Sequence, residues 1–171
     1  MLNKKAREQL RDLLPLSMVA TKPWLLDQGL SLHFLDNAIR SGTLVPLAPG
    51  VYTLHKQTVR WQGIVASLQR MSENPTHVGG LTALKLANLT HFLSTGPEER
   101  IQLYSESQLP RWIQRVAVTA DFEWHGTKKL WQESIMVNSG FSRQYHWQEG
   151  LPPIKYSCPE KAIMEVLTGV P

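Results

Sequence analysis

The stretch Lys22–Leu54, KPWLLDQGLSLHFLDNAIRSGTLVPLAPGVYTL, decides the fold of the first part of the chain. It opens with a pattern that predicts a helix from Lys22 to Gln28. Pro23 stands in the first turn of that helix, where its missing N–H group costs no hydrogen bond. Gly29 follows, and glycine is the residue type that most readily ends a helix in a left-handed conformation. This segment therefore predicts a short helix with a defined end.

A second helix follows at once. Ser31 is a favoured N-cap residue for the segment LHFLDNAIRS, and Gly42 is placed to end it. Two short apolar runs, 44–47 and 51–54, then flank a Pro-Gly turn, which is the pattern of a β-hairpin. Two helices joined by a tight turn and followed by a hairpin form a winged helix-turn-helix, a module whose second helix usually enters the major groove of DNA.

The second helix separates apolar and polar side chains on two faces. At 100° per residue, one side collects the apolar residues Leu32, Leu35, Ala38 and Ile39. His33, Asn37 and Arg40 form a stripe on the opposite side, and these groups can hydrogen-bond base edges or phosphates. Asp36 precedes Arg40 by one helical turn, so we expect the two to pair. An ordinary solvated polar face remains an alternative for the stripe, although the turn and the hairpin around it favour DNA.

Charge is concentrated at the same end of the chain. The whole sequence has a net charge of +4, and residues 1–60 hold eight basic and four acidic side chains, whereas residues 61–171 hold ten of each. The segment 3–14, NKKAREQLRDLL, predicts an amphipathic helix that presents Lys4, Lys5, Arg7 and Arg11. This excess suits a segment that meets phosphate groups. The hairpin tip, residues 48–50, has no basic residue.

Composition limits the class of protein. With 171 residues and 42% hydrophobic side chains, the chain can form one ordinary domain or two small ones. No apolar run approaches the ~20 residues of a membrane span, and the charged N-terminus does not resemble a secretory signal. A single cysteine, Cys158, excludes an internal disulfide and a multi-cysteine metal site. We therefore expect a cytoplasmic protein without a metal ion or other cofactor.

The remainder of the chain predicts a second domain of shorter elements. We expect the winged helix-turn-helix domain to span residues 1–58 and a small mixed domain to span residues 59–171, which gives an α+β protein. The second domain begins with a helix over 61–71. Further helices are predicted over 83–89, 109–113 and 159–167, and strands over 101–104, 116–119, 135–137 and 154–157. Gly79-Gly80 is interpreted as a strand-to-helix turn, because it lacks the Gly-Lys-Ser/Thr of a phosphate-binding loop.

No motif indicates catalysis. The six histidines lack the close spacing of metal ligands, there is no G-x-S-x-G, and no local pattern marks Cys158 as a nucleophile. An enzyme whose site assembles only in space stays open as a weaker reading. Trp112, Trp124 and Trp131 stand beside basic residues, which is compatible with a partner surface. A partly buried core position is the favoured interpretation for these tryptophans.

The blocks LLPLSMVATKPWLLDQGLS and RSGTLVPLAPGVYTL resemble the N-terminal domain of AbiEi-type antitoxins. The blocks THVGGLTALKLANLTHFL, IQLYSESQLPRWIQR and SCPEKAIMEVL resemble the second domain of the same family. The resemblance implies a cytoplasmic prokaryotic regulator encoded beside a nucleotidyltransferase-like toxin, AbiEii. It also implies an N-terminal domain that represses its own promoter by binding inverted repeats, a C-terminal domain that carries antitoxicity, and no enzymatic activity. The family is often longer, so this chain is expected to be a truncated product.

The predicted function is thus a DNA-binding autorepressor and antitoxin of a type IV-like toxin–antitoxin pair, a monomer in solution or a dimer on DNA. The family places DNA contacts at the helix that begins at Ser31 and at the hairpin around 47–52, where relatives commonly carry a basic residue and this chain has Pro49. The predicted DNA-binding residues are Lys4, Lys5, Arg7, Arg11, Lys22, Ser31, His33, Asn37, Arg40 and Tyr52. A winged helix that docks a protein is the alternative from another class.

Overall fold

The structure is a computed structural model that describes residues 2–90, 99–116 and 118–169. The chain forms two compact units. The first comprises Met1–Ser67 and Arg111–Val118, and the second comprises Leu68–Pro110 and Thr119–Pro171. Both units mix helices and strands, so the predicted α+β class is confirmed.

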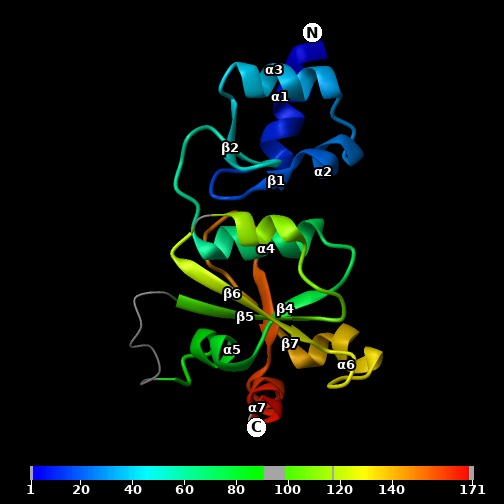
Figure 1. The fold of residues 1–171 in the computed structure, drawn as a ribbon, viewed down its shortest axis with the longest axis vertical. Coiled ribbons are helices and arrows are strands. Elements are labelled where there is room, and N and C mark those ends of the chain that lie inside the picture. The colour runs from blue at the N-terminus through cyan, green and yellow to red at the C-terminus, as the bar shows by residue number, and fades with distance from the viewer. Residues whose placement is uncertain (1, 91–98, 117, 170–171) are drawn as a thin grey trace. The chain divides into compact units, whose positions relative to one another are not determined.

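Three helices of the first unit begin and end within one residue of where the sequence predicts. They are α1 (Leu2–Leu13), α2 (Lys22–Asp27) and α3 (Leu32–Arg40), shown in Figure 1. The Ser31 side chain accepts a hydrogen bond of 3.2 Å from the Phe34 N–H group, which satisfies a free donor at the start of α3. Gly29 and Gly42 follow α2 and α3 with φ of +94° and +76°, a conformation that glycine adopts without a Cβ penalty.

A small antiparallel sheet follows these helices. It contains β1 (Ala20–Thr21), β2 (Leu44–Ala48) and β3 (Val51–Leu54) in the order β1-β3-β2. The predicted hairpin is therefore confirmed, with a bulge between Pro46 and Ala48. The backbone N–H of Lys22 donates to the Gly50 carbonyl over 3.3 Å, so the hairpin turn is tied to the start of α2.

The core of the first unit is built from one face of each element. Its largest fully buried side chains are Leu10, Leu14, Met18, Leu25, Leu35, Leu44, Ile64 and Ile113. Helix α4 (Trp61–Met71) contributes Ser67, whose hydroxyl accepts from the Val19 N–H at 2.9 Å and donates to the Gly63 carbonyl at 2.7 Å. A Cβ at Gly63 would lie 1.9 Å from the Ser17 carbonyl oxygen. Only glycine allows this close approach.

The second unit is organised around a mixed five-stranded sheet. Its strands are β4 (Thr76–Val78), β5 (Glu99–Ser105), β6 (Ala120–Gly126), β7 (Ser142–Tyr145) and β8 (Ile154–Ser157), in the order β6-β5-β4-β8-β7. The pairs β5–β6 and β4–β8 are parallel, and the other two pairs are antiparallel. The Gln69 side chain bridges two strands, because it donates to the carbonyls of Thr76 and Lys155 and accepts from the Lys155 N–H.

Helices accompany this sheet. They are α5 (Gly80–Leu86), α6 (Glu133–Val137) and α7 (Pro159–Thr168), with a short 3₁₀ turn, η2 (Ser139–Phe141), before β7. Helices α5 and α7 pack against each other and lie on the same side of the sheet in Figure 1. The predicted helix over 159–167 and the strands at 101–104 and 154–157 are confirmed.

Two expectations for this half of the chain are wrong, and one strand was not predicted. The strand predicted at 116–119 includes residue 117, which lies outside the described residues; residues 116, 118 and 119 form no strand, and β6 begins at Ala120, after the 3₁₀ helix η1 (Arg111–Arg115) and the buried Val116. The strand predicted at 135–137 belongs to α6, whose first turn carries Glu133 beside the partial positive charge of the helix N-terminus. Strand β7 was not predicted, because Arg143 and Gln144 are both exposed and show no alternation of polar and apolar residues.

Candidate nucleic-acid interface

The polar stripe predicted on α3 is present as a connected set of side chains. His33, Asn37 and Arg40 are all exposed, whereas Leu35 and Ala38 on the opposite face are buried. The Asn37 amide nitrogen lies 3.0 Å from Nε2 of His33, and Nη1 of Arg40 donates to the Asn37 Oδ1 over 3.3 Å. Each side chain therefore orients the next, and the unused donors and acceptors of the stripe face outward. The set has the composition needed to bind base edges.

Asp36 does not pair with Arg40, so this expectation is wrong. Its carboxylate lies 2.6 Å from the Lys22 ammonium at the start of α2. Asp36 is half-buried and its carboxylate reaches Lys22 of α2, whereas Arg40 is exposed. The pair is exposed enough that we expect it to contribute less than about 1 kcal/mol to stability. The Lys22–Asp36 pair joins α2 to α3 and compensates the charge of Lys22. It also leaves the Arg40 guanidinium facing solvent.

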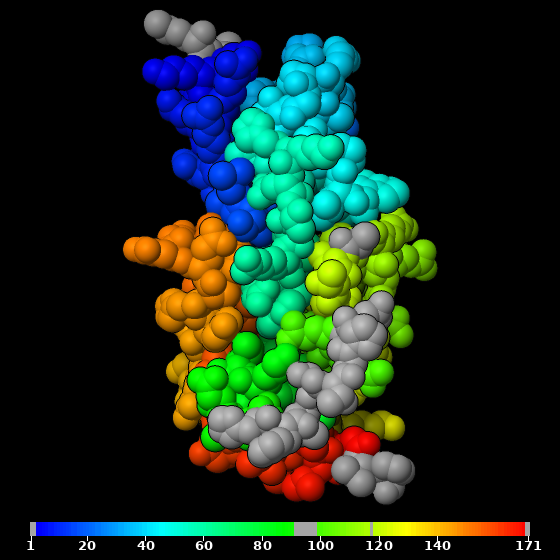
Figure 2. Space-filling model, turned by 90° about the vertical axis from the view of Figure 1, so that its left-hand side faces the viewer, coloured from blue at the N-terminus to red at the C-terminus, as the bar shows by residue number. Residues whose placement is uncertain are grey.

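A groove separates α1 from α3 and extends the surface around the stripe. Its volume is about 590 Å³, and it is lined by residues of both helices and the segments that flank α3: Asn3, Ala6, Arg7, Gln9, Gly29, Leu30, Ser31, His33, Phe34, Asn37, Ala38, Ser41 and Thr43. In Figure 2 the deep-blue α1 and the light-blue α3 stand apart as two ridges. Four predicted site residues, Arg7, Ser31, His33 and Asn37, therefore border one cavity.

The remaining predicted residues lie around this groove or on the hairpin. Lys4, Lys5 and Arg11 are exposed on α1 and do not line the groove. Tyr52 is half-buried in the middle of β3, where it pairs with Ala20 on one side and Pro46 on the other.

Basic residues from a distant part of the chain join the first unit. Counted by unit, the first holds ten basic and four acidic side chains, and the second holds eight and ten. Arg111 and Arg115 of η1 account for the increase over residues 1–60, and both are exposed. The sequence alone did not show this, because nothing in the segment 111–118 indicates that it packs with the N-terminal unit.

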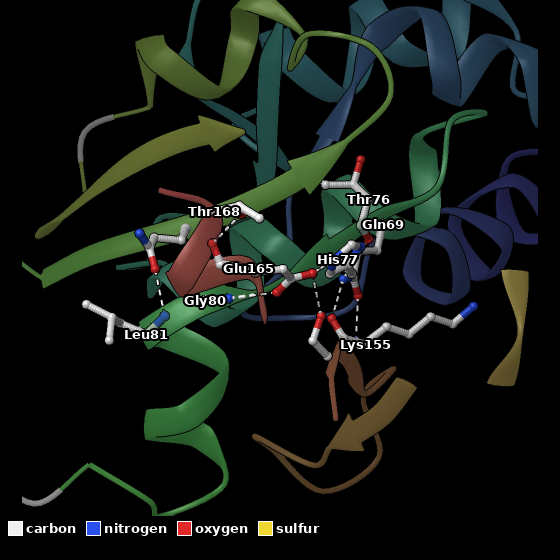
Figure 3. Close-up of polar contacts among 10 residues, drawn as sticks. Gln69, Thr76, His77, Gly80, Leu81, Lys155, Glu165 and Thr168 are labelled. Carbon is white, nitrogen blue, oxygen red and sulfur yellow. Dashed lines mark hydrogen bonds and ion pairs between the residues drawn. The ribbon is translucent and has the colours of Figure 1, made fainter. Parts of the chain in front are cut away.

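A second polar cluster is buried in the second unit, centred on Glu165 of α7 (Figure 3). The Glu165 carboxylate accepts hydrogen bonds from Nε2 of His77 at 2.7 Å, the Gly80 N–H at 2.8 Å and the Ser157 hydroxyl at 2.9 Å. The side chain of Glu165 is 0% exposed and that of His77 is 8% exposed. These bonds connect α7 to β4, β8 and the first residue of α5.

Burial and hydrogen bonding act in opposite directions on this cluster. Burial lowers the pKa of His77 because it penalises the charged imidazolium, and the bond to Glu165 only partly offsets this. Burial alone would raise the pKa of Glu165. The hydrogen bonds from His77, Gly80 and Ser157 outweigh it, so the pKa of Glu165 falls below its usual range. The ionised carboxylate is therefore the form that the fold stabilises.

The Gly79-Gly80 turn is shaped by this carboxylate. A Cβ at Gly79 would lie 2.3 Å from Oε2 of Glu165 and 2.5 Å from Cδ2 of Tyr104, and Gly80 has φ of +55°. The interpretation of Gly79-Gly80 as a strand-to-helix turn is confirmed. Sequence reasoning missed Glu165, since a single glutamate in a C-terminal helix carries no signal of its partner 88 residues earlier. With its acceptors occupied and its side chain out of solvent, Glu165 holds elements together and does not face a substrate.

Within the described ranges, no group of three or more His, Cys, Asp and Glu side chains is placed to hold a metal ion. No helix in the same residues is long and apolar enough to span a membrane.

Two family models match the chain. The model described as "Transcriptional regulator, AbiEi antitoxin N-terminal domain" matches residues 3–95, and the model described as "Transcriptional regulator, AbiEi antitoxin, Type IV TA system" matches residues 98–171. The chain belongs to the AbiEi antitoxin family. Its resemblance to this family, noted from separate sequence blocks, is thereby confirmed. The AbiEi descriptions name a transcriptional regulator and an antitoxin, and they name no reaction. The comparison with curated proteins found no match.

Proposed function

We propose that this AbiEi protein binds the DNA upstream of its own gene as an autorepressor and neutralises a nucleotidyltransferase-like toxin of the AbiEii type. The observation that carries the DNA-binding half is the exposed stripe of His33, Asn37 and Arg40 on α3. We interpret α2 and α3 as a helix-turn-helix and the β2–β3 hairpin as its wing. In this arrangement α3 is the helix that enters the major groove.

The geometry of the stripe suits base recognition. Arg40 can donate two parallel hydrogen bonds to guanine, and the amide of Asn37 can both donate to and accept from adenine. Their mutual hydrogen bond reduces the number of rotamers that must be fixed on binding. His33 lies one helical turn before Asn37, so the three side chains follow the axis of α3 and can meet successive bases.

Phosphate contacts come from the surrounding surface. We assign Lys4, Lys5, Arg7 and Arg11 of α1 to the backbone of the duplex, together with the exposed Ser31 hydroxyl at the start of α3. Such contacts set the register of the protein on DNA without reading its sequence. We assign smaller roles to Lys22, whose charge Asp36 compensates, and to Tyr52, which is half-buried.

We assign antitoxicity to the region after residue 58, and specifically to the second compact unit. This activity requires no catalysis by the chain itself. Its partner is the cognate toxin, and we expect the regulator to act in the cytoplasm, as a monomer in solution or as a dimer on inverted repeats. Co-expression with the neighbouring toxin tests this half of the proposal. We expect the cells to lose their protection against the toxin when residues 68–110 and 119–171 carry destabilising substitutions.

The DNA-binding half is tested with the purified full chain and a duplex of the DNA upstream of its gene, against a scrambled duplex, at two salt concentrations. Tighter binding to the upstream duplex, with a steep loss of affinity at higher salt, is expected because phosphate contacts release counterions.

A protein-docking surface is the second candidate function for the first unit. It is favoured by the hairpin turn, which has no basic residue at 48–50 and whose Gly50 carbonyl is bound by the Lys22 N–H group. Binding to neither duplex at either salt concentration would support this candidate. A pull-down with the neighbouring toxin would then follow.

A further inference from the structure

The groove between α1 and α3 contains hydrogen-bond donors that the proposed base and phosphate contacts do not use. Asn3 reaches it from α1. Gln9 of α1 also lines it, although its amide nitrogen already donates to the Gln28 carbonyl at 2.8 Å. After α3, the Ser41 hydroxyl donates to the Ala38 carbonyl and the Thr43 hydroxyl lies 3.1 Å from that of Ser41, so these two donors are used within the protein. Arg7 and His33 are the basic groups on its walls. Among the described residues that line it, none is Asp or Glu. A surface of this composition attracts a ligand that is anionic and rich in acceptors.

The groove is also joined to the stripe on α3. His33 and Asn37 belong to both, so a molecule that these side chains touch lies directly beside α1. If α3 lies in the major groove of a duplex, one of the two flanking backbones must run along the side of α3 that faces α1. A phosphodiester offers only acceptors, and Asn, Ser and Thr side chains supply many of the phosphate and sugar contacts in protein–DNA interfaces.

We propose that this groove takes one sugar–phosphate strand of the duplex that α3 reads, with uncharged donors as direct contacts. Asn3 on α1 is the residue that the arrangement newly assigns to DNA. The inference rests on the proposed DNA-binding function and specifies how the duplex lies on it.

The charges beyond the groove favour a strand of DNA over a small anion. A small anion would be held by the lining alone, whereas a strand continues past it. Lys4 and Lys5 are exposed on α1 outside the groove, where a continuing strand would meet them. No acidic residue opposes them on the walls, and the lining is shared by two helices.

The first test compares Asn3→Ala and Asn3→Asp in the full chain, with the upstream duplex as the probe. Removing one uncharged donor is expected to weaken binding about three- to tenfold without a change in the slope of affinity against salt, because no counterion is released at this contact. A carboxylate at the same position is expected to weaken binding more than tenfold. Thr58→Asp is the matched control. Thr58 is exposed and does not line the groove. The affinity of Thr58→Asp for the upstream duplex should therefore stay within about twofold of that of the original chain.

The second test locates the contact on the DNA. Each phosphate of the upstream duplex is replaced in turn by a neutral methylphosphonate, and binding is measured with the original chain and with Asn3→Ala. At one or two adjacent phosphates the methylphosphonate should weaken binding of the original chain but should not weaken binding of Asn3→Ala any further. This is expected because both changes remove the same interaction.

The outcomes separate the two claims. If the original chain binds neither the upstream nor the scrambled duplex, the proposed function fails. The inference is overturned if the original chain binds DNA normally but both Asn3 variants bind the upstream duplex as tightly as Thr58→Asp does. It is also overturned if the loss from Asn3→Ala and the loss from the methylphosphonate add at every phosphate, because the strand then does not lie in the groove.

Discussion

The two units place similar polar groups in opposite environments. In the first, His33 and Asn37 are exposed on α3 and bond to each other within one helix. In the second, His77 and Glu165 are buried and join strand β4 to helix α7 across 88 residues of sequence. A hydrogen bond at the surface exchanges with water at little net cost, whereas a buried group that loses its partner retains the full penalty of desolvation. The first arrangement is therefore suited to recognition and the second to holding a fold.

The largest expected effect comes from the buried arrangement. Glu165→Ala leaves His77, the Gly80 N–H and the Ser157 hydroxyl without their common acceptor. We expect the second unit to lose about 3–5 kcal/mol of stability, as when one partner of a buried pair is removed. Urea unfolding of the full chain, with hydrogen exchange read by peptide, measures the loss in each unit. Protection in β4 and β8 that survives the substitution would contradict the assigned role of Glu165.

Packing in the first unit supplies the next effect. Gly63→Ala places a Cβ where the Ser17 carbonyl oxygen lies. Relief requires a movement of backbone, for which we expect a cost of about 1–3 kcal/mol. Hydrogen exchange read by peptide should show increased opening of α4 and of the backbone around Ser17. Ala66→Gly in the same helix is the comparison: it should cost about 1 kcal/mol through helix propensity and the lost buried methyl group, but it creates no clash with Ser17.

Arg40→Ala sharpens the contrast between the units. Arg40 is exposed, so unfolding stability should change by less than about 0.5 kcal/mol. Binding to the upstream duplex should weaken by about 1–3 kcal/mol, the range expected for an arginine that contacts guanine. Titration of labelled duplex gives the affinity. Equal affinities for Arg40→Ala and the original chain across salt concentrations would remove Arg40 from the interface.

Acid should affect the buried arrangement selectively. The pKa of His77 is lowered in the fold, so the unfolded chain binds more protons as pH falls below the ordinary histidine value near 6.5. The pKa of Glu165 is also lowered, so its contribution is present above the ordinary glutamate value near 4.3 and is lost as pH falls through the folded value. The His77 shift predicts that the second unit loses stability from about pH 6.5 downward, and the Glu165 shift predicts a further loss below about pH 4.3.

Unfolding curves of the full chain at a series of pH values between 7.5 and 4 test this dependence. The chain with His77→Gln should lose the part of the pH dependence that lies near 6.5 and retain the part nearer 4. An unchanged curve for His77→Gln would show that another group is responsible.

The smallest expected effect concerns Lys22 and Asp36. Their 2.6 Å ion pair is partly exposed, and salt screens such pairs, so Lys22→Ala should cost no more than about 1 kcal/mol. A double-mutant cycle with Asp36→Ala isolates the pair. A coupling energy that does not decrease in high salt would contradict this account of the pair.

Local signals explain which parts of the fold could be predicted from sequence. Ser31, Gly29 and Gly42 act on neighbouring backbone groups, so the bounds of α2 and α3 follow from nearby residues. The His77–Glu165 bond and the return of η1 to the first unit depend on contacts across the chain, and no local pattern records them. Asp36 shows the same limit on one helix. Spacing alone favoured Arg40 as its partner, but the packing of α2 placed Lys22 closer.

The candidate interface also combines a feature that the sequence predicts with one that only the structure shows. The polar stripe follows from helical periodicity, and the structure adds the hydrogen bonds that connect it. The groove did not follow from the sequence, because it depends on how α1 packs beside α3. The uncharged residue Asn3 carried no charge signal and became a candidate only through its position.

The central claim is that the α3 stripe reads sequence while the α1 surface supplies general affinity. Competition of the upstream duplex against a scrambled duplex, for the original chain and for a variant with His33, Asn37 and Arg40 all changed to alanine, tests it most directly. The original chain should prefer the upstream duplex by about a thousandfold or more. The variant should bind both duplexes alike and retain salt-sensitive affinity through α1. A variant that keeps the original preference would contradict the account.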